Sequence, residues 1–235
     1  MKTRTQYTVR AVRLISFSAF VALGGCMSLG RGEPAQQHYV LGGGLPRQSE
    51  ATTSDPPGLT IGVRRLQIAP YLETPFILVR RGPNQIGFSE FHRWGETPSA
   101  GINRAVAGYL RERASLRAID VAPWPAGERY DYVIQLHVLR FEGVSQGEPP
   151  AGVGGVVMLA TWEIIRQLDG AVLERGTTDY RENGWTVGDY AGLVTLLDAG
   201  LHVLTDQLLS SINELNVSAT VTVSPSASRS PPPRR

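Results

Sequence analysis

The sequence predicts an α+β domain: a mainly antiparallel sheet with two helices packed on one face. Three observations support this class. Two segments repeat apolar residues at helical spacing, several runs alternate like strands, and turn signals separate neighbouring runs. The predicted order is β-β-β-α-β-β-β-α. Residues 59–215 are long enough for one ordinary domain, and two domains would be cramped.

The first half of the domain contains three predicted strands. Residues 59–68 alternate in places and are rich in β-forming residues. Residues 76–80 and 85–88 flank the turn at 81–84, so they predict a hairpin. Upstream, the short apolar island 38–41 fits an additional edge strand of the same domain.

The first helix is predicted from Pro98 to Leu116. Thr97 is a good N-cap residue, and proline is well tolerated at the first helical position. The apolar residues that fall mostly on one face of this segment are Ile102, Val106, Tyr109, Leu110 and Leu116. A loop with two prolines follows at 121–128.

Three strands are predicted in the second half, beginning with residues 130–141. One face of this strand carries Tyr132, Ile134, Leu136 and Val138, and the other carries Asp131, Gln135 and His137. Residues 142–154 are rich in glycine and proline and predict a loop. Residues 155–168 and 171–181 flank Asp169–Gly170, which predicts a hairpin, and Asn183–Gly184 is predicted to break its second strand.

The last helix is predicted from Asp189, as cap, to about Leu215. Its apolar stripe consists of Tyr190, Val194, Leu197, Leu201, Leu204 and Leu208. Residues 216–235 are rich in serine and proline and end in arginine, so they predict a disordered tail.

Residues 1–25 have the three parts of a secretory signal peptide. The basic residues Lys2, Arg4, Arg10 and Arg13 precede an apolar run at 14–23, which is too short to span a bilayer as a helix. Small residues then lead to Cys26, the only cysteine. Without a second cysteine, the mature chain has no internal disulfide.

The segment Leu23-Gly24-Gly25-Cys26 resembles a bacterial lipobox. This resemblance implies that Cys26 receives a diacylglycerol and that its freed amino group takes a further acyl chain such as palmitate. The alternative is a chance cysteine near an ordinary cleavage site. Met27 follows in place of the aspartate that retains such lipoproteins in the inner membrane, which favours the outer membrane of a Gram-negative cell. Residues 26–58 then form a flexible tether.

Charge and motifs exclude several functional classes. Removing the four basic residues of the signal leaves 19 basic residues against 21 acidic ones, which argues against a nucleic-acid binder. The histidines His38, His92, His137 and His202 show no metal-binding spacing, and no nucleophile elbow or phosphate loop is present. We therefore expect no cofactor, no metal site and no enzymatic activity.

One polar and aromatic cluster stands out, Phe91-His92-Arg93-Trp94-Gly95-Glu96. It fits a packed connector in which Trp94 seats the first helix on the sheet and Arg93 pairs with an acidic neighbour. It also fits a partner interface formed by Phe91, His92, Arg93, Trp94 and Glu96, because tryptophan and arginine are enriched at interface hot spots.

Around this cluster the sequence resembles the ABC-type transport auxiliary lipoproteins, the family of the paraquat-inducible lipoprotein C. The resemblance covers about residues 38–213 and includes Tyr39-Val40-Leu41, Ile68-Ala69-Pro70-Tyr71-Leu72 and the Phe91–Glu96 cluster. It implies a periplasm-facing, lipid-anchored accessory subunit of an MCE-type system that carries lipids between the two membranes. The implied partner is an MCE-family lipid transport protein, and self-association into a homo-oligomer stays open.

Two functions of other classes remain. Small anchored α+β domains also serve as assembly factors or plugs for outer-membrane proteins. An envelope hydrolase is the third candidate, although carboxylates such as Glu90, Glu96, Glu142 and Glu163 are scattered and cannot be paired from their spacing.

Overall fold

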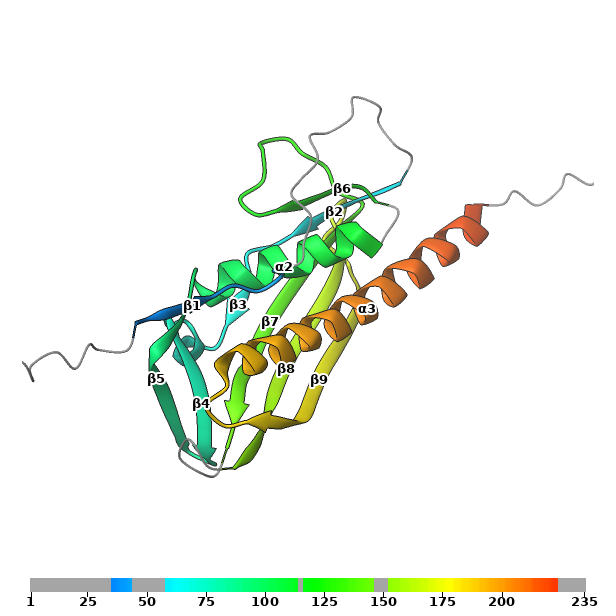
Figure 1. Ribbon diagram of the computed structural model, residues 1–235. Helices are drawn as coiled ribbons and strands as arrows, with labels where there is room; N and C mark the ends of the chain where they lie inside the picture. Colours follow the sequence, from blue (N-terminus) through cyan, green and yellow to red (C-terminus); the bar gives the residue numbers. More distant parts are fainter. Residues whose placement is uncertain (1–34, 44–57, 114–115, 146–151, 224–235) are drawn as a thin grey trace, which may run out of the picture. The chain divides into compact units, whose positions relative to one another are not determined.

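The computed structural model describes residues 35–43, 58–113, 116–145 and 152–223 (Figure 1). Within these residues, nine strands form one sheet and two long helices pack against it. The strands are β1 Gln37–Tyr39, β2 Leu59–Val63, β3 Gln67–Ile68, β4 Phe76–Gly82, β5 Gln85–Trp94, β6 Leu116–Val121, β7 Tyr132–Val144, β8 Val153–Arg166 and β9 Val172–Thr186. The helices are α2 Pro98–Arg113 and α3 Tyr190–Val223, with a short 3-10 turn η2 at Pro70–Leu72.

The sheet is mixed, so the prediction of a mainly antiparallel sheet is wrong. Strand β7 pairs antiparallel with β8, which pairs antiparallel with β9. On its other side β7 meets β2, β3 and β4 in turn, and all three pairings are parallel. The chain passes through α2 and β6 before it enters β7, and such a crossover is what a parallel neighbour requires.

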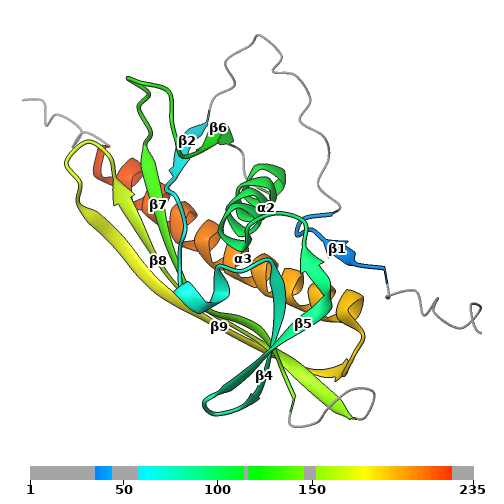
Figure 2. The same ribbon diagram turned by 90° about the vertical axis from the view of Figure 1, so that its left-hand side faces the viewer.

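Both helices lie on the same, concave face of the curved sheet (Figure 2). The predicted inner face of β7 is confirmed, because Ile134, Leu136 and Val138 are fully buried. The predicted stripe of α3 meets them, with Leu197 and Leu201 also fully buried. Burial of these aliphatic side chains stabilises the domain by about 1.5–3 kcal/mol each.

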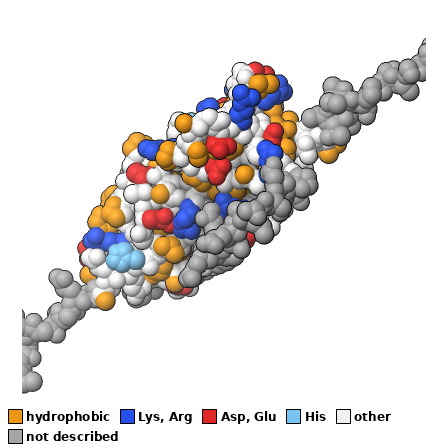
Figure 3. All heavy atoms as spheres, turned by 90° about the horizontal axis from the view of Figure 1, so that it is seen from above, with side chains coloured by type: hydrophobic (Ala, Val, Ile, Leu, Met, Phe, Trp, Pro, Cys, Tyr) orange, Lys and Arg blue, Asp and Glu red, His pale blue; other side chains and the backbone are white. Residues whose placement is uncertain are grey.

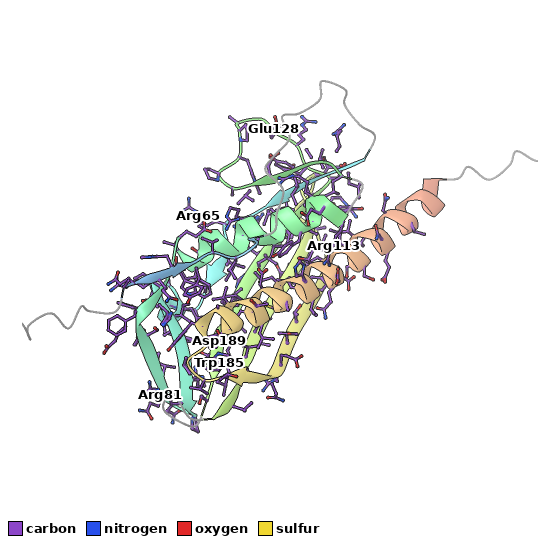
Figure 4. All side chains as sticks on the ribbon, viewed as in Figure 1. Arg65, Arg81, Arg113, Glu128, Trp185 and Asp189 are labelled. Atoms are coloured by element: carbon purple, nitrogen blue, oxygen red, sulfur yellow. The ribbon has the colours of Figure 1, made fainter. Side chains whose placement is uncertain are left out.

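Both helix starts agree with the sequence. Helix α2 begins at Pro98, and the Gly101 amide donates to the Thr97 carbonyl over 3.0 Å. At α3, the side chain of Asp189 accepts a hydrogen bond from the Gly192 amide at 3.0 Å, the geometry of an N-cap. Figure 4 shows Trp185 and Asp189 at this turn, where the indole of Trp185 donates to the Asp189 carbonyl at 2.7 Å.

Two helix ends differ from the prediction. Helix α2 stops at Arg113, and residues 116–121, which were not predicted as a strand, form β6 beside β2. Helix α3 continues to Val223 because no proline interrupts residues 216–223. The rest of the predicted tail, 224–235, lies outside the described residues.

Three strand boundaries also differ. The first predicted strand is divided into β2 and β3, and β7 runs past Phe141 to Val144. Strand β9 passes through Asn183–Gly184 to Thr186, because a register shift near Gly154 absorbs Gly184 in its positive-φ conformation. The predicted hairpin turn at Asp169–Gly170 is present, with Gly170 at a φ of 72°.

Candidate interface at the β5–α2 junction

The predicted Phe91–Glu96 cluster forms the junction where β5 ends and α2 begins. Trp94 is 8% exposed and belongs to the main core, with its ring 5.9 Å from that of Phe141. Ile102 and Val106 of α2 share this core. Trp94 therefore seats α2 on the sheet, as the connector interpretation expects, and presents little surface to a partner.

His92 faces the helices. Its ring stacks on Tyr190 with a centroid distance of 4.2 Å, and its Nδ1 lies 2.9 Å from the Tyr39 hydroxyl. Burial lowers the pKa of His92 below its ordinary value. Burial also raises the pKa of Tyr39, and the nearby Asp189 carboxylate adds to this effect. His92 thus joins β5 to β1 and to the start of α3.

Arg93 points to the opposite face of the sheet. Its guanidinium carbon lies 4.7 Å from the centre of the Phe76 ring, a cation–π geometry. Its Nε is buried and has no hydrogen-bond partner among the described residues. The acidic partner that the connector interpretation expects is not present within that part of the chain, so Arg93 keeps an unneutralised charge there.

A surface pocket of about 240 Å³ opens beside the junction. Its lining consists of Glu73, Thr74, Pro75, Trp94, Gly95, Glu96, Thr97 and Pro98. Glu96 binds Arg104 at 2.5 Å, and Glu73 accepts a hydrogen bond from Ser99 at 2.8 Å. The pocket therefore combines an apolar floor of tryptophan and proline with two carboxylates.

The segment Gln36–Gly43, which we call the strap, crosses this region. The Gly95 amide donates to the Tyr39 carbonyl at 2.7 Å, and Arg104 donates to the Leu41 carbonyl at 2.8 Å. Leu41 itself is 2% exposed. The strap is thus attached to both the sheet and α2.

Asp198 of α3 completes this attachment. Its carboxylate accepts hydrogen bonds from the Gly42 amide at 3.1 Å and from the Tyr109 hydroxyl at 2.7 Å. Sequence reasoning missed this role. The available signal was a single acid placed between apolar residues of a core-facing helix, which needs a buried partner.

A second group that the sequence did not reveal surrounds Glu142. This residue was placed in a loop, but it lies in β7 and is 0% exposed. Its carboxylate accepts from Arg80 at 2.6 Å, from Arg140 at 2.8 Å and from the Tyr71 hydroxyl at 3.2 Å. The hydrogen bond to Glu142 raises the pKa of Arg80. Every oxygen is satisfied, which indicates a structural role.

The remaining predicted site residues are placed as follows. Phe91 is half-buried on β5, and Cys26 lies outside the described residues. Within the described ranges, no three histidine, cysteine or acidic side chains gather as metal ligands would. The same ranges contain no helix with the length and apolar character needed to cross a bilayer.

Comparisons with known proteins agree with this architecture. The model of the ABC-type transport auxiliary lipoprotein component matches residues 39–209. A search of curated proteins finds no match.

Among solved structures, a protein of Xanthomonas campestris aligns with a TM-score of 0.61 at 16% identity, over 78% of this chain and 99% of its own. A second, uncharacterized protein gives a TM-score of 0.54 at 15% identity, over 76% of this chain and 99% of its own. Both show the same fold. The PelC dodecamer of Paraburkholderia phytofirmans gives a TM-score of 0.38 at 21% identity, over 66% of this chain and 93% of its own.

Proposed function

Because the chain belongs to the ABC-type transport auxiliary lipoprotein family, we propose that it is a non-catalytic, outer-membrane accessory subunit of an MCE-type lipid transport system. The family match over residues 39–209 carries this proposal. The lipobox-like segment that ends at Cys26 supports the membrane anchor. Lipid movement then occurs mainly in the partner, while this domain holds the partner near the outer membrane.

The anchor is the acylated Cys26. Two acyl chains give stable membrane attachment, since each buried CH₂ contributes about 0.8 kcal/mol. In a Cys26→Ala variant, we expect fatty-acid labelling to disappear and the protein to leave the membrane fraction. Labelling that survives this substitution would refute the anchor.

The partner contact is the pocket at the β5–α2 junction. Its apolar floor suits a partner's side chain, and Glu73 and Glu96 favour a basic group on that segment. Glu96 is partly neutralised by Arg104, so Glu73, which is exposed, contributes most to the charge preference. The partner we propose is a periplasmic MCE-family protein.

A photo-crosslinking residue in place of Thr74 tests this contact in cells. We expect a crosslink to an MCE-family protein that a Glu73→Arg change abolishes. Glu174→Arg is the matched control, because Glu174 is an exposed acid on β9, away from the pocket. Equal crosslinking in both charge-reversed variants, or capture of only unrelated proteins, would overturn the proposed docking site.

A further inference from the structure

Two large apolar side chains are exposed close to strand β5. Val40 is 54% exposed and Phe88 is 51% exposed, which places both among the exposed large hydrophobic side chains of the described residues. Phe88 meets the half-buried Phe76 edge to face at 6.1 Å. The Arg93 guanidinium also lies over the Phe76 ring, and we call Phe76, Phe88 and Arg93 the hairpin face.

The hairpin face carries one positive charge, the Arg93 guanidinium, which lies against an aromatic ring. Phe76 pairs with Arg93 across β4 and β5, and the guanidinium lies over the Phe76 ring. No carboxylate among the described residues neutralises Arg93. Glu90, which is exposed in the irregular part of β5, is the acidic residue closest along the strand. Figure 3 shows apolar, basic and acidic side chains interspersed at the end of the domain that carries β1 and β5.

The register of β1 indicates where the preceding chain leaves the sheet. Strand β1 runs parallel to β5, with Gln37 beside His92 and Tyr39 beside Trp94. The direction that leads back from Gln37 along the sheet therefore points from His92 toward Phe88. Ten residues separate Cys26 from Gln37. A chain of that length spans about 35 Å when fully extended and about 18 Å as a flexible coil.

We propose that the hairpin face rests on the surface of the same bilayer that holds the Cys26 lipid. Phe88 and Phe76 lie at the boundary between headgroups and acyl chains, where aromatic side chains are enriched. Arg93 binds a lipid phosphate, for which its planar donors are suited. This inference rests on the proposed acyl anchor, and it adds which face of the domain meets the membrane.

The tether makes such a small contact effective. A face with one exposed phenylalanine and one arginine that has no carboxylate partner among the described residues would bind vesicles only weakly from solution. Once Cys26 is inserted, the contact becomes intramolecular, and a short linker gives it an effective concentration in the millimolar range. The domain then holds a fixed orientation, with the strap and the pocket at the β5–α2 junction close to the membrane surface.

Dye quenching in vesicles tests this orientation. The acylated full-length chain is reconstituted in phosphatidylethanolamine and phosphatidylglycerol that contain brominated acyl chains. A dye is attached at Gln85→Cys, which lies on the β4–β5 hairpin and leaves Phe88 and Arg93 intact. Because Cys26 is the only native cysteine and its sulfur is in the thioether, the new thiol is labelled alone.

The matched control carries the dye at Leu168→Cys. Leu168 is 90% exposed at the β8–β9 turn, beyond the Arg166–Tyr132 pair and thus at the opposite end of β7 from the β4–β5 hairpin. We expect strong quenching at position 85 and little at position 168. Equal quenching at both positions, or quenching at 168 alone, would overturn the inference.

Two charge variants test the role of Arg93. Arg93→Gln should weaken docking of the hairpin face on the membrane about fivefold, as reported by quenching of the dye at position 85. This is the effect of one basic residue near an anionic surface. Arg129→Gln, an exposed arginine in the loop before β7, should leave docking unchanged. Circular dichroism confirms that each variant is folded. Equal docking in both variants would overturn the lipid-phosphate contact.

The remaining outcomes separate this inference from the anchor itself. Intact mass establishes whether the protein is acylated. An acylated chain without quenching at position 85 overturns the inference and leaves the proposed function standing, whereas a chain without acyl mass overturns both. A blue shift at position 85 that requires high protein concentration and no vesicles would assign the hairpin face to a second copy instead.

Discussion

At the scale of single residues, Glu142 shows how one buried charge organises a sheet face. Its carboxylate is fully buried and holds Arg80 and Arg140, which are 20% and 27% exposed. Breaking a buried pair costs more than the pair contributes, because the remaining charges lose their compensation. Glu142 is therefore needed for stability even though it has no part in the proposed contacts.

A Glu142→Gln variant should lower the free energy of unfolding by about 2–3 kcal/mol, as measured by urea denaturation. Glu163→Gln is the control, since Glu163 pairs with an exposed Arg175. Glu163→Gln should change the free energy of unfolding by no more than about 0.5 kcal/mol. Similar losses in the two variants would contradict the structural role of Glu142.

The lowered pKa of His92 predicts that the stability of the fold depends on pH. Burial lowers its folded-state pKa, so between that pKa and the unfolded value of about 6.5 the unfolded chain binds more protons. The contribution of neutral His92 to the free energy of unfolding is fully present above about pH 6.5. It is lost as the pH falls through the folded-state pKa. A His92→Gln variant should lose less stability than the wild type between pH 8 and pH 5 in thermal unfolding. An equal loss would show that His92 does not contribute.

The structural roles of some residues could be predicted from the sequence, and those of others could not. Asp189 as a cap and Trp94 as the seat of α2 follow from local pattern, and the structure agrees. Asp198 and Glu142 could not be interpreted, because Asp198 binds groups 89 and 156 positions away, and Glu142 binds Arg80 and Tyr71, which lie 62 and 71 positions away. Only the folded chain brings these groups together.

At the scale of elements, the strap depends on few contacts. Strand β1 has three paired positions with β5, and Asp198 holds the following turn. An Asp198→Ala change should cost about 1–3 kcal/mol, because it leaves the Gly42 amide and the Tyr109 hydroxyl without an acceptor. Hydrogen exchange at residues 39–43 should accelerate more than exchange in β7.

Two further variants make this test specific. Asp198→Asn retains an acceptor oxygen and should restore part of the protection. Asp206→Asn removes an exposed partner of Arg113, which Figure 4 shows on α2, and should change stability by about 0.5 kcal/mol or less. If Asp206→Asn accelerates exchange in the strap as much as Asp198→Ala, the assignment of Asp198 is wrong.

Elements with long, regular patterns were predictable, and strand neighbours were not. The inner face of β7 and the stripe of α3 follow from periods of two and 3.6 residues. The parallel pairing of β2, β3 and β4 with β7 could not be derived, because it depends on the path of the chain through α2 and β6. Hairpin signals favour antiparallel neighbours and say nothing about distant strands.

At the scale of the whole molecule, the proposed anchor at Cys26 lies outside the folded domain. The compact unit that contains the sheet and both helices begins at Gln36, after Cys26. We expect a Cys26→Ser variant to unfold with the same free energy as the acylated chain, within about 0.5 kcal/mol, because Cys26 lies outside this unit. Urea denaturation in the same detergent checks this, and a larger difference would mean that the anchor contributes to folding.

The most direct test of the proposed function is the identity of the bound partner. The acylated chain is purified at its natural level from its own cell envelope, and co-purifying proteins are identified by mass spectrometry. We expect recovery of an MCE-family lipid transport protein, together with a barrier defect when the gene is deleted. Recovery of an outer-membrane protein without any MCE protein, or of unrelated proteins with an intact barrier, would contradict the proposed function.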